Sequence, residues 1–303
     1  MTDIAVAPLP PLLYEPLVRT AMAEDLGCAG DITTDTVIPT GAKAAGLFNV
    51  RRPGVVAGLD VAAMAFRLLD PEIGFSVLRP DGSRASAGDA IARVSGNAHA
   101  LLTAERVALN FLCHLSGVAT ATRALVDAVG ERRARICCTR KTTPGLRALE
   151  KYAVRLGGGI NHRFGLDDGV LLKDNHIVVA GGIRPAIERA RRSIGHMVKI
   201  EVEVDSAGQI EEALAAGADA ILLDNMTPEQ MRRAVDLIAG RATVEASGRI
   251  TLDTVRPVAE SGVDLISSGA ITHSAPILDI GLDFEPLSVI DVPPRAEVRA
   301  RGE

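Results

Sequence analysis

Residues 197–224, MVKIEVEVDSAGQIEEALAAGADAILLD, decide the fold class of this chain of 303 residues. Met197–Val204 alternates apolar and charged side chains as a half-buried strand does, and Ala220–Leu223 is a second short apolar run. Between them, 206–216 has the apolar spacing of an amphipathic helix and follows a capping signal, Asp205-Ser206. This order of strand, helix and strand predicts a right-handed βαβ unit with two parallel strands.

The same unit repeats on both sides of this stretch. Further strands are predicted at Arg135–Thr139, Gly169–Leu172, Ala242–Ala246 and Val263–Ser267. Amphipathic helices are predicted at 145–157, 182–194, 227–239 and 251–261, the last two after the capping signals Thr227-Pro228-Glu229 and Thr251-Leu252-Asp253. Six consecutive units favour a (β/α) barrel over an open doubly wound sheet, although periodicity alone does not separate the two.

The first third of the chain has a different pattern. A helix is predicted at 12–24, a strand over Ala42–Val56, a hairpin around Pro80-Asp81-Gly82-Ser83 and a long helix at about 97–129. A separate α+β module therefore precedes the barrel. We assign 1–117 to this module and 118–275 to the barrel, and we expect 276–303 to pack with the first module. Val292–Glu303 is rich in Pro, Arg and Glu and is expected to be frayed.

Composition excludes several classes of protein. The chain is 47% hydrophobic and 23% charged, as soluble globular proteins are, and no apolar run approaches the roughly 18 residues of a membrane span. Met1–Pro11 has no secretory pattern, and the four cysteines have neither CxxC nor zinc spacing, so we expect a cytoplasmic protein. A net charge of −5 and few aromatic residues argue against nucleic acid as a partner.

Positive charge is concentrated in one part of this acidic chain. Between Glu131 and Lys173 there are ten Lys or Arg residues and only four Asp or Glu residues. The segment 139–176 contains Arg140, Lys141 and Arg163 on or after predicted strands. A local positive field of this kind predicts a site for a small, highly charged anion.

Polar residues follow the predicted barrel strands, where the active sites of such barrels lie. Strand side chains alternate with period two, so Lys173 shares a face with Leu171, and Glu201 shares a face with Glu203. If these faces point into the barrel mouth, cations from two strands meet carboxylates from the next two. The pattern predicts a site for an anionic substrate and a divalent metal, with Glu203 and Asp224 as oxygen ligands.

Two Ser-Gly pairs follow the last two predicted strands. Ser247-Gly248 and Ser268-Gly269 lie where barrels commonly bind phosphate, because backbone N–H groups of a glycine turn can point at an anion. We therefore predict a phosphate site there. His273 is equally consistent with a phosphate contact and with a surface histidine that caps a helix.

Structural interpretations compete with these functional ones. Glu201 and Glu203 could belong to a solvated edge strand, and Lys173 could pair with Asp174. Arg106, in the middle of a predicted helix, is by itself better explained as a surface salt bridge. Gly157–Gly159 predicts a helix end and a mobile loop, which His162 and Arg163 could merely decorate.

Short motifs of a known family are spread over nearly the whole chain. They are Glu24-Asp25-Leu26-Gly27, Gly30-Asp31-Ile32-Thr33, Glu105-Arg106-Val107-Ala108-Leu109-Asn110, Ser116-Gly117-Val118-Ala119-Thr120, Thr139-Arg140-Lys141-Thr142-Thr143-Pro144-Gly145, Asn161-His162-Arg163, Leu172-Lys173-Asp174-Asn175-His176, Glu201-Val202-Glu203-Val204, Leu223-Asp224-Asn225 and Glu245-Ala246-Ser247-Gly248. By these motifs the chain resembles the quinolinate phosphoribosyltransferase family. The resemblance implies an N-terminal α/β sandwich domain, an incomplete (β/α) barrel of about six to seven strands, and a homodimer or a multiple of dimers with a shared active site.

The resemblance also implies roles for residues. The quinolinate pocket maps to Arg106 from the neighbouring subunit and to Arg140, Lys141, His162, Arg163 and Lys173. The ribose and magnesium–pyrophosphate side maps to Glu203 and Asp224, and the 5′-phosphate side to Ser247, Gly248, Gly269 and His273. Lys141, Glu203 and Asp224 are the expected catalytic residues, with Mg²⁺ as the cofactor. Arg249 stands where many relatives have a second glycine.

The implied activity is phosphoribosyl transfer from phosphoribosyl pyrophosphate to quinolinate with decarboxylation, which yields nicotinate mononucleotide, CO₂ and pyrophosphate for NAD biosynthesis. A molybdenum-transport-associated relative of the same fold is an alternative, but that branch departs at Lys173-Asp174-Asn175-His176, which this chain keeps. A Schiff-base aldolase on Lys173 or Lys141 is another. The density of charged groups argues against a third, a non-catalytic phosphate-binding regulator.

Overall fold

The computed structural model describes residues 6–285, so the prediction for Val292–Glu303 lies outside the described residues. Its C-terminal part is a parallel sheet with the strand order β6-β11-β10-β9-β8-β7. These strands are β6 (Arg135–Cys137), β7 (Val170–Leu172), β8 (Ile200–Val204), β9 (Ala220–Asp224), β10 (Thr243–Ser247) and β11 (Leu265–Ser267). Every pair of neighbours is parallel, and β6 and β7 stand at the two ends of the order, so the barrel is incomplete.

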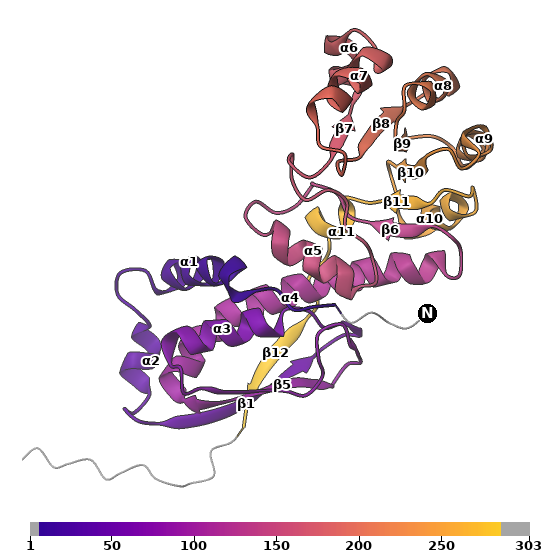
Figure 1. Cartoon of the computed structure of the whole chain (residues 1–303). Coiled ribbons are helices and arrows are strands. Elements are labelled where there is room, and N and C mark those ends of the chain that lie inside the picture. The colour runs from indigo at the N-terminus through magenta and orange to yellow at the C-terminus, as the bar shows by residue number, and fades with distance from the viewer. Residues whose placement is uncertain (1–5, 286–303) are drawn as a thin grey trace, which may run out of the picture.

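Helices follow the strands around this barrel, as Figure 1 shows. They are α5 (Arg147–Leu156), α6 (Asp174–Ala180), α7 (Ile183–Ser193), α8 (Ala207–Ala215), α9 (Pro228–Ile238), α10 (Leu252–Ala259) and the short α11 (Ala270–His273). The predicted caps at Thr227 and Thr251 are confirmed, because each hydroxyl accepts a hydrogen bond from the amide three residues on. Ser206 stands at the N-cap of α8 as predicted, but its side chain makes no capping bond. Sequence analysis also missed α6, whose first residue directly follows Lys173.

The N-terminal part is built on an antiparallel sheet with the order β12-β1-β5-β3. Its strands are β1 (Lys43–Val50), β3 (Gly74–Val77), β5 (Ala90–Asn97) and β12 (Ile280–Phe284). Around it lie the 3-10 turn η1 (Pro11–Leu13) and the helices α1 (Glu15–Leu26), α2 (Ile32–Val37), α3 (Leu59–Leu69) and α4 (Ala98–Val129). Strand β12 pairs with β1, so the chain returns to this sheet after the barrel.

Two sequence predictions in this part need correction. The single strand predicted over Ala42–Val56 is broken after Val50, and β2 (Gly54–Val55) pairs instead with β4 (Arg84–Ala85) in a separate sheet. Pro53 lies at the break, and proline has no N–H to donate to a sheet. The turn at 80–83 forms, but the strands around it do not pair as one hairpin, since β3 pairs with β5. Helices α2 and α3 were not predicted.

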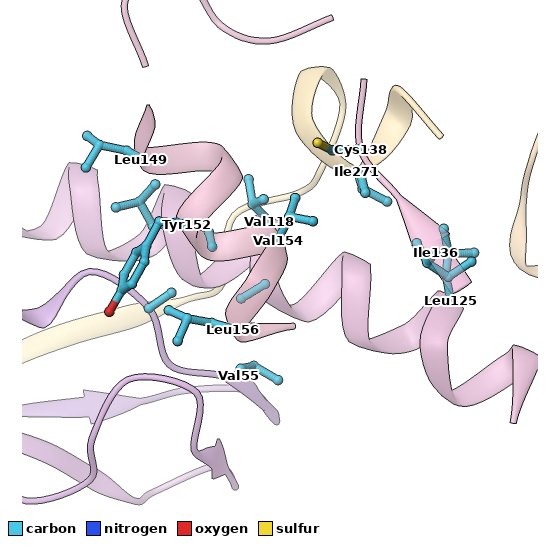
Figure 2. Packing of buried hydrophobic residues seen from close by; sticks show 14 of the residues in the cluster. Val55, Val118, Leu125, Ile136, Cys138, Leu149, Tyr152, Val154, Leu156 and Ile271 are labelled. Atoms are coloured by element: carbon cyan, nitrogen blue, oxygen red, sulfur yellow. The ribbon is translucent and has the colours of Figure 1, made fainter. Parts of the chain in front are cut away.

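The long helix α4 joins the two parts (Figure 1). The predicted boundary at 117/118 falls inside this helix, where a Cβ on Gly117 would lie 2.2 Å from the carbonyl oxygen of Pro276. Figure 2 shows Val154 of α5 beside Val118 of α4, both within the cluster of buried hydrophobic residues. Both helices therefore belong to one hydrophobic core. This packing holds the end of α5 in place, and with it the start of the segment that leads to β7. None of the helices in residues 6–285 combines the length and apolar character needed to cross a membrane.

Candidate active site

A cavity of about 630 Å³ opens at the carboxyl ends of the barrel strands. Eleven of the twelve residues predicted for the site line it: Arg140, Lys141, His162, Arg163, Lys173, Glu203, Asp224, Ser247, Gly248, Gly269 and His273. Thr139, Asn225, Glu245 and Arg249 line it as well. The strand ends thus converge on one space, as the barrel topology requires.

Arg106 is the predicted residue that the structure does not bring to this cavity. It lies on α4 and lines a separate hollow with Asp25, Asp31 and Thr103. No ion pair involving Arg106 is formed within residues 6–285, so the surface salt bridge of the structural interpretation is not seen there. Within one chain, Arg106 cannot contact an anion held in the main cavity.

Opposite charges meet at the ends of adjacent strands β7 and β8. The ammonium of Lys173 pairs with Oε2 of Glu203, not with Asp174. Strand β8 is an interior strand, and Glu201 is only 9% exposed, so the interpretation of a solvated edge strand is wrong. The predicted meeting of cations and carboxylates in the barrel mouth is therefore confirmed.

Two arginines of the cavity have hydrogen-bonding capacity to spare. The Nε atoms of Arg140 and Arg163 are buried and have no hydrogen-bond partner among the residues that the structure describes. Arg163 is held by a bond from Nη1 to the carbonyl oxygen of Gly169. Burial and the neighbouring Arg140 lower the pKa of Arg163. Buried donors without partners are rare in native proteins, so this pair is suited to a bound anion.

His162 is held between carboxylates behind this pair. Its Nε2 lies 2.9 Å from Oε2 of Glu201 and 3.8 Å from Oε2 of Glu245. The backbone amide of Arg163 donates to Nδ1, which leaves Nε2 as the nitrogen that donates to Glu201. Burial alone lowers the pKa of His162, but the hydrogen bond with Glu201 and the negative field of Glu245 outweigh it and raise that pKa.

Glu245 is a site residue to which sequence analysis gave no role. It is 1% exposed, and its Oε1 has no hydrogen-bond partner within the described residues. Burial and the nearby charge of Glu201 raise the pKa of Glu245 to about 7. The available signal was a glutamate inside an otherwise apolar strand, because a charge that a strand buries needs a partner or a proton.

The opposite wall of the cavity is built from glycine turns. Gly248 has a φ of +100°, and a Cβ there would lie 2.3 Å from Oδ1 of Asn225. A Cβ on Gly269 would lie 2.9 Å from Cδ of Lys141 and 3.1 Å from the ring of His273. The side chains of Lys141 and His273 therefore lie beside Gly269, whereas Gly248 adopts a left-handed backbone that favours glycine.

The donor chemistry of the cavity fits a divalent cation. Glu203 and Asp224 offer carboxylate oxygens at the ends of adjacent strands, and Mg²⁺ in phosphate sites typically uses one or two carboxylates together with substrate phosphates. Oδ2 of Asp224 accepts one bond, 2.7 Å long, from Nδ2 of Asn225 and has no cationic partner among residues 6–285. His162, Glu201 and Glu245 form a second group of possible metal ligands, with ligand atoms within 4.8 Å of one another. In this group His162 and Glu201 are already joined by a hydrogen bond.

Comparison with known proteins agrees with this geometry. The family model "Quinolinate phosphoribosyl transferase, N-terminal domain" matches residues 31–116, and the corresponding C-terminal domain model matches residues 118–283. The nicotinate-nucleotide pyrophosphorylase [carboxylating] of Mycobacterium leprae is 46% identical, with 88% of this chain and 95% of that protein covered. The Bacillus subtilis protein described as a probable enzyme of this name is 44% identical, over 90% of this chain and 93% of its own.

A solved structure extends the likeness to three dimensions. The crystal structure of NadC from Streptococcus pyogenes has a TM-score of 0.88 and 43% identity to this chain. It covers 92% of this chain and 100% of its own. Matches to both domain models and to full-length relatives above 40% identity leave one assignment: this chain belongs to the quinolinate phosphoribosyltransferase family.

Proposed function

We propose that this chain transfers the phosphoribosyl group of phosphoribosyl pyrophosphate to quinolinate and decarboxylates the product to nicotinate mononucleotide. The observation that carries the proposal is the pair of half-buried arginines, Arg140 and Arg163, whose Nε atoms are buried and have no hydrogen-bond partner in the part of the chain described. A pyridine dicarboxylate supplies planar anionic groups, and forked guanidiniums bind these in two-pronged geometry. Lys173 and His162 complete this wall of the cavity.

The opposite wall suits the phosphoribosyl donor. Ser247, Gly248 and Gly269 present exposed backbone for a 5′-phosphate, with Lys141 and His273 beside them. Glu203 and Asp224 would hold Mg²⁺, which when bound neutralises charge on pyrophosphate. Both ligands then occupy one cavity, with the dicarboxylate and the ribose facing each other.

The reaction follows from that arrangement. The pyridine nitrogen attacks the anomeric carbon as the bond from that carbon to pyrophosphate breaks. Positive charge develops on the ribose, and Glu203 and Asp224 stabilise it. The carboxylate next to the quaternised nitrogen leaves as CO₂, its electron pair stays on the ring carbon as an ylide, and a proton from solvent completes nicotinate mononucleotide. Lys141 balances negative charge at the phosphate side.

An assay with purified protein tests this function. Quinolinate, phosphoribosyl pyrophosphate and magnesium should yield nicotinate mononucleotide, CO₂ and pyrophosphate in equal amounts. Nicotinate in place of quinolinate should yield far less product, because nicotinate lacks the second carboxylate and two cations of the pocket then have no partner. Equal rates with both substrates would refute the dicarboxylate assignment, and chelation of magnesium should abolish turnover.

We also propose that two subunits share each active site. Arg106 lines a hollow separate from the cavity of its own chain. The family resemblance implies that this arginine enters the pocket of the neighbouring subunit. A subunit with Arg106→Ala mixed with a subunit carrying Asp224→Ala should regain part of the activity, because one site of the mixed dimer has both residues intact. Verified mixed dimers that stay inactive would contradict sharing.

The Schiff-base alternative has a direct test. A lysine that forms an imine must be unprotonated, whereas Lys173 pairs with Glu203 and lies in a cavity with other cations. Borohydride should therefore trap no carbonyl substrate on Lys173 or Lys141. We further place the protein in the cytoplasm, since its four cysteines are free thiols, as in reducing compartments; cell fractionation tests this.

A further inference from the structure

Lys151 on α5 is a buried cation for which the reaction provides no role. It is 2% exposed, and in the described chain no ion pair joins it to a carboxylate. Its Nζ donates instead to the carbonyl oxygen of His162, 2.9 Å away, and contacts Sγ of Cys138 at 3.0 Å. Burying an ammonium group costs free energy unless hydrogen bonds replace the water that it loses, so we ask what the two bonds of Lys151 hold in place. Here they fix the main chain of a site residue.

Glu201 holds the same residue from the other side. It belongs to strand β8, and its carboxylate bonds the His162 ring at 2.9 Å. The main chain of His162 is thus fixed by a helix and its imidazole by a strand. Neither Lys151 nor Glu201 lines the cavity, so neither is placed to touch a substrate.

The neighbours of His162 are tied down as well. Sγ of Cys138 donates to Oδ1 of Asn161, and Nη1 of Arg163 donates to the carbonyl oxygen of Gly169. Upstream, Gly157 and Gly159 pack closely on α4, where a Cβ would lie 2.5 Å from Ala119 O and 2.8 Å from Thr122 Cγ2. These glycines thus permit close packing on α4. Together with the two hydrogen bonds, this packing contradicts the mobile loop that the sequence predicted.

We propose that Lys151 and Glu201 are positioning residues that hold the segment Asn161–Arg163 in its binding conformation before any substrate arrives. Ordering a loop on binding costs affinity, and a site held in advance avoids that cost. The inference deepens the proposed function, because it takes from that function only the identity of the anion, an aromatic dicarboxylate.

Hydrogen exchange of the ligand-free protein tests the preorganisation directly. Lys151→Met and Glu201→Leu should each speed exchange of the amides of residues 160–165 by tenfold or more, since each removes a bond that closes the segment. Lys199→Met on the solvent side of the barrel, with an 80% exposed side chain, is the matched control and should leave these amides unchanged. Exchange as slow as in the unsubstituted protein would overturn the proposal.

Kinetics separate positioning from general stability. Both variants should raise KM for quinolinate about tenfold or more, while KM for phosphoribosyl pyrophosphate stays within about twofold. Glu201→Gln keeps an oxygen that accepts from His162 Nε2–H and should restore most of the quinolinate affinity that Glu201→Leu loses. Equal increases in both KM values, or no rescue by glutamine, would contradict the proposal.

The two hypotheses fail in different ways. If the unsubstituted protein does not use quinolinate, the proposed function is wrong, yet the exchange experiment still tests the segment. If one variant does not fold, the glutamine–leucine comparison at Glu201 or the Lys151→Met measurement stands alone. Unchanged exchange and unchanged KM in an active enzyme would reject the positioning role and leave the function intact.

Discussion

The two walls of the cavity are built by different means. On one wall His162, Arg163 and Lys173 present charged side chains, held from behind by Glu201 and other buried polar groups. On the other, Gly248 and Gly269 present backbone, and at Gly248 a positive φ and the side chain of Asn225 leave no room for a Cβ. Side-chain charge needs support from distant parts of the chain, whereas a glycine turn is specified locally. The first wall should therefore be disrupted by substitutions that shorten a charged side chain, and the second by substitutions that add a methyl group to a glycine.

Arg163→Ala should have the largest effect and should be confined to the first wall. It removes a partly buried guanidinium with an unpaired Nε, so quinolinate affinity should fall by about a hundredfold or more, as when one partner of a buried charge pair is lost. Affinity for phosphoribosyl pyrophosphate should change little. Calorimetric titration with each ligand measures both, and Arg155→Ala on the exposed face of α5 is the control. Equal losses for the two ligands would abolish the distinction between the walls.

Gly248→Ala should have a somewhat smaller effect than Arg163→Ala, and that effect should be confined to the second wall. The added Cβ meets Asn225 at 2.3 Å in a backbone region unfavourable to alanine, a strain of about 1–3 kcal/mol. KM for phosphoribosyl pyrophosphate should rise roughly thirtyfold, with KM for quinolinate nearly unchanged. Gly208→Ala, where a Cβ meets nothing within 4 Å, controls for the substitution itself. A larger effect on quinolinate would mean that the walls have been assigned in reverse.

Glu245→Gln should have the smallest effect, which is a change in how the free energy of unfolding depends on pH. Burial and Glu201 raise the folded-state pKa of Glu245 to about 7, above that of an unfolded glutamate. The resulting contribution to stability is fully present below the unfolded value and is lost as pH rises through about 7. Between pH 6 and 8 the natural protein should therefore lose about 1–2 kcal/mol relative to Glu245→Gln.

Urea unfolding at several pH values measures that difference. Glu188→Gln, at an exposed position on α7, should leave the profile unchanged. A natural protein that gains stability over this range relative to Glu245→Gln would show that Glu245 is ionised in the fold. The support of the first wall would then rest on an ionised carboxylate rather than on a protonated one.

Local pattern was sufficient for much of the fold. The strand–helix period placed all six barrel strands, and polar residues at the predicted strand ends identified Lys173, Glu203 and Asp224 from the sequence alone. The long helix was predicted within a residue of α4. These features follow from periodicity, which each segment expresses by itself. Helices α2, α3 and α6 escaped prediction, two of them because a short helix has few turns in which to show its period.

Other features depend on contacts between distant elements. Glu201 and Glu203 share one strand face, yet Glu203 lines the cavity while Glu201 lies deeper and bonds His162. Glu203 is nearer the carboxyl end of β8, where the cavity opens, but the strand period does not reveal that Glu201 has His162 as its partner. Lys151 had no signal in its own helix, since its partners are Cys138, directly after β6, and His162, in the segment before β7.

The amino-acid sequence by itself determined the alternation of strands and helices, the glycine turns of the phosphate wall and the types of charge at the strand ends. Only the tertiary structure decided which of those charges face the cavity and which lie behind it, and it kept Arg106 away from its own chain's site. The physical reason is range. Propensity and turn chemistry act over a few residues, whereas burial and the pairing of buried charges depend on which elements the fold brings together.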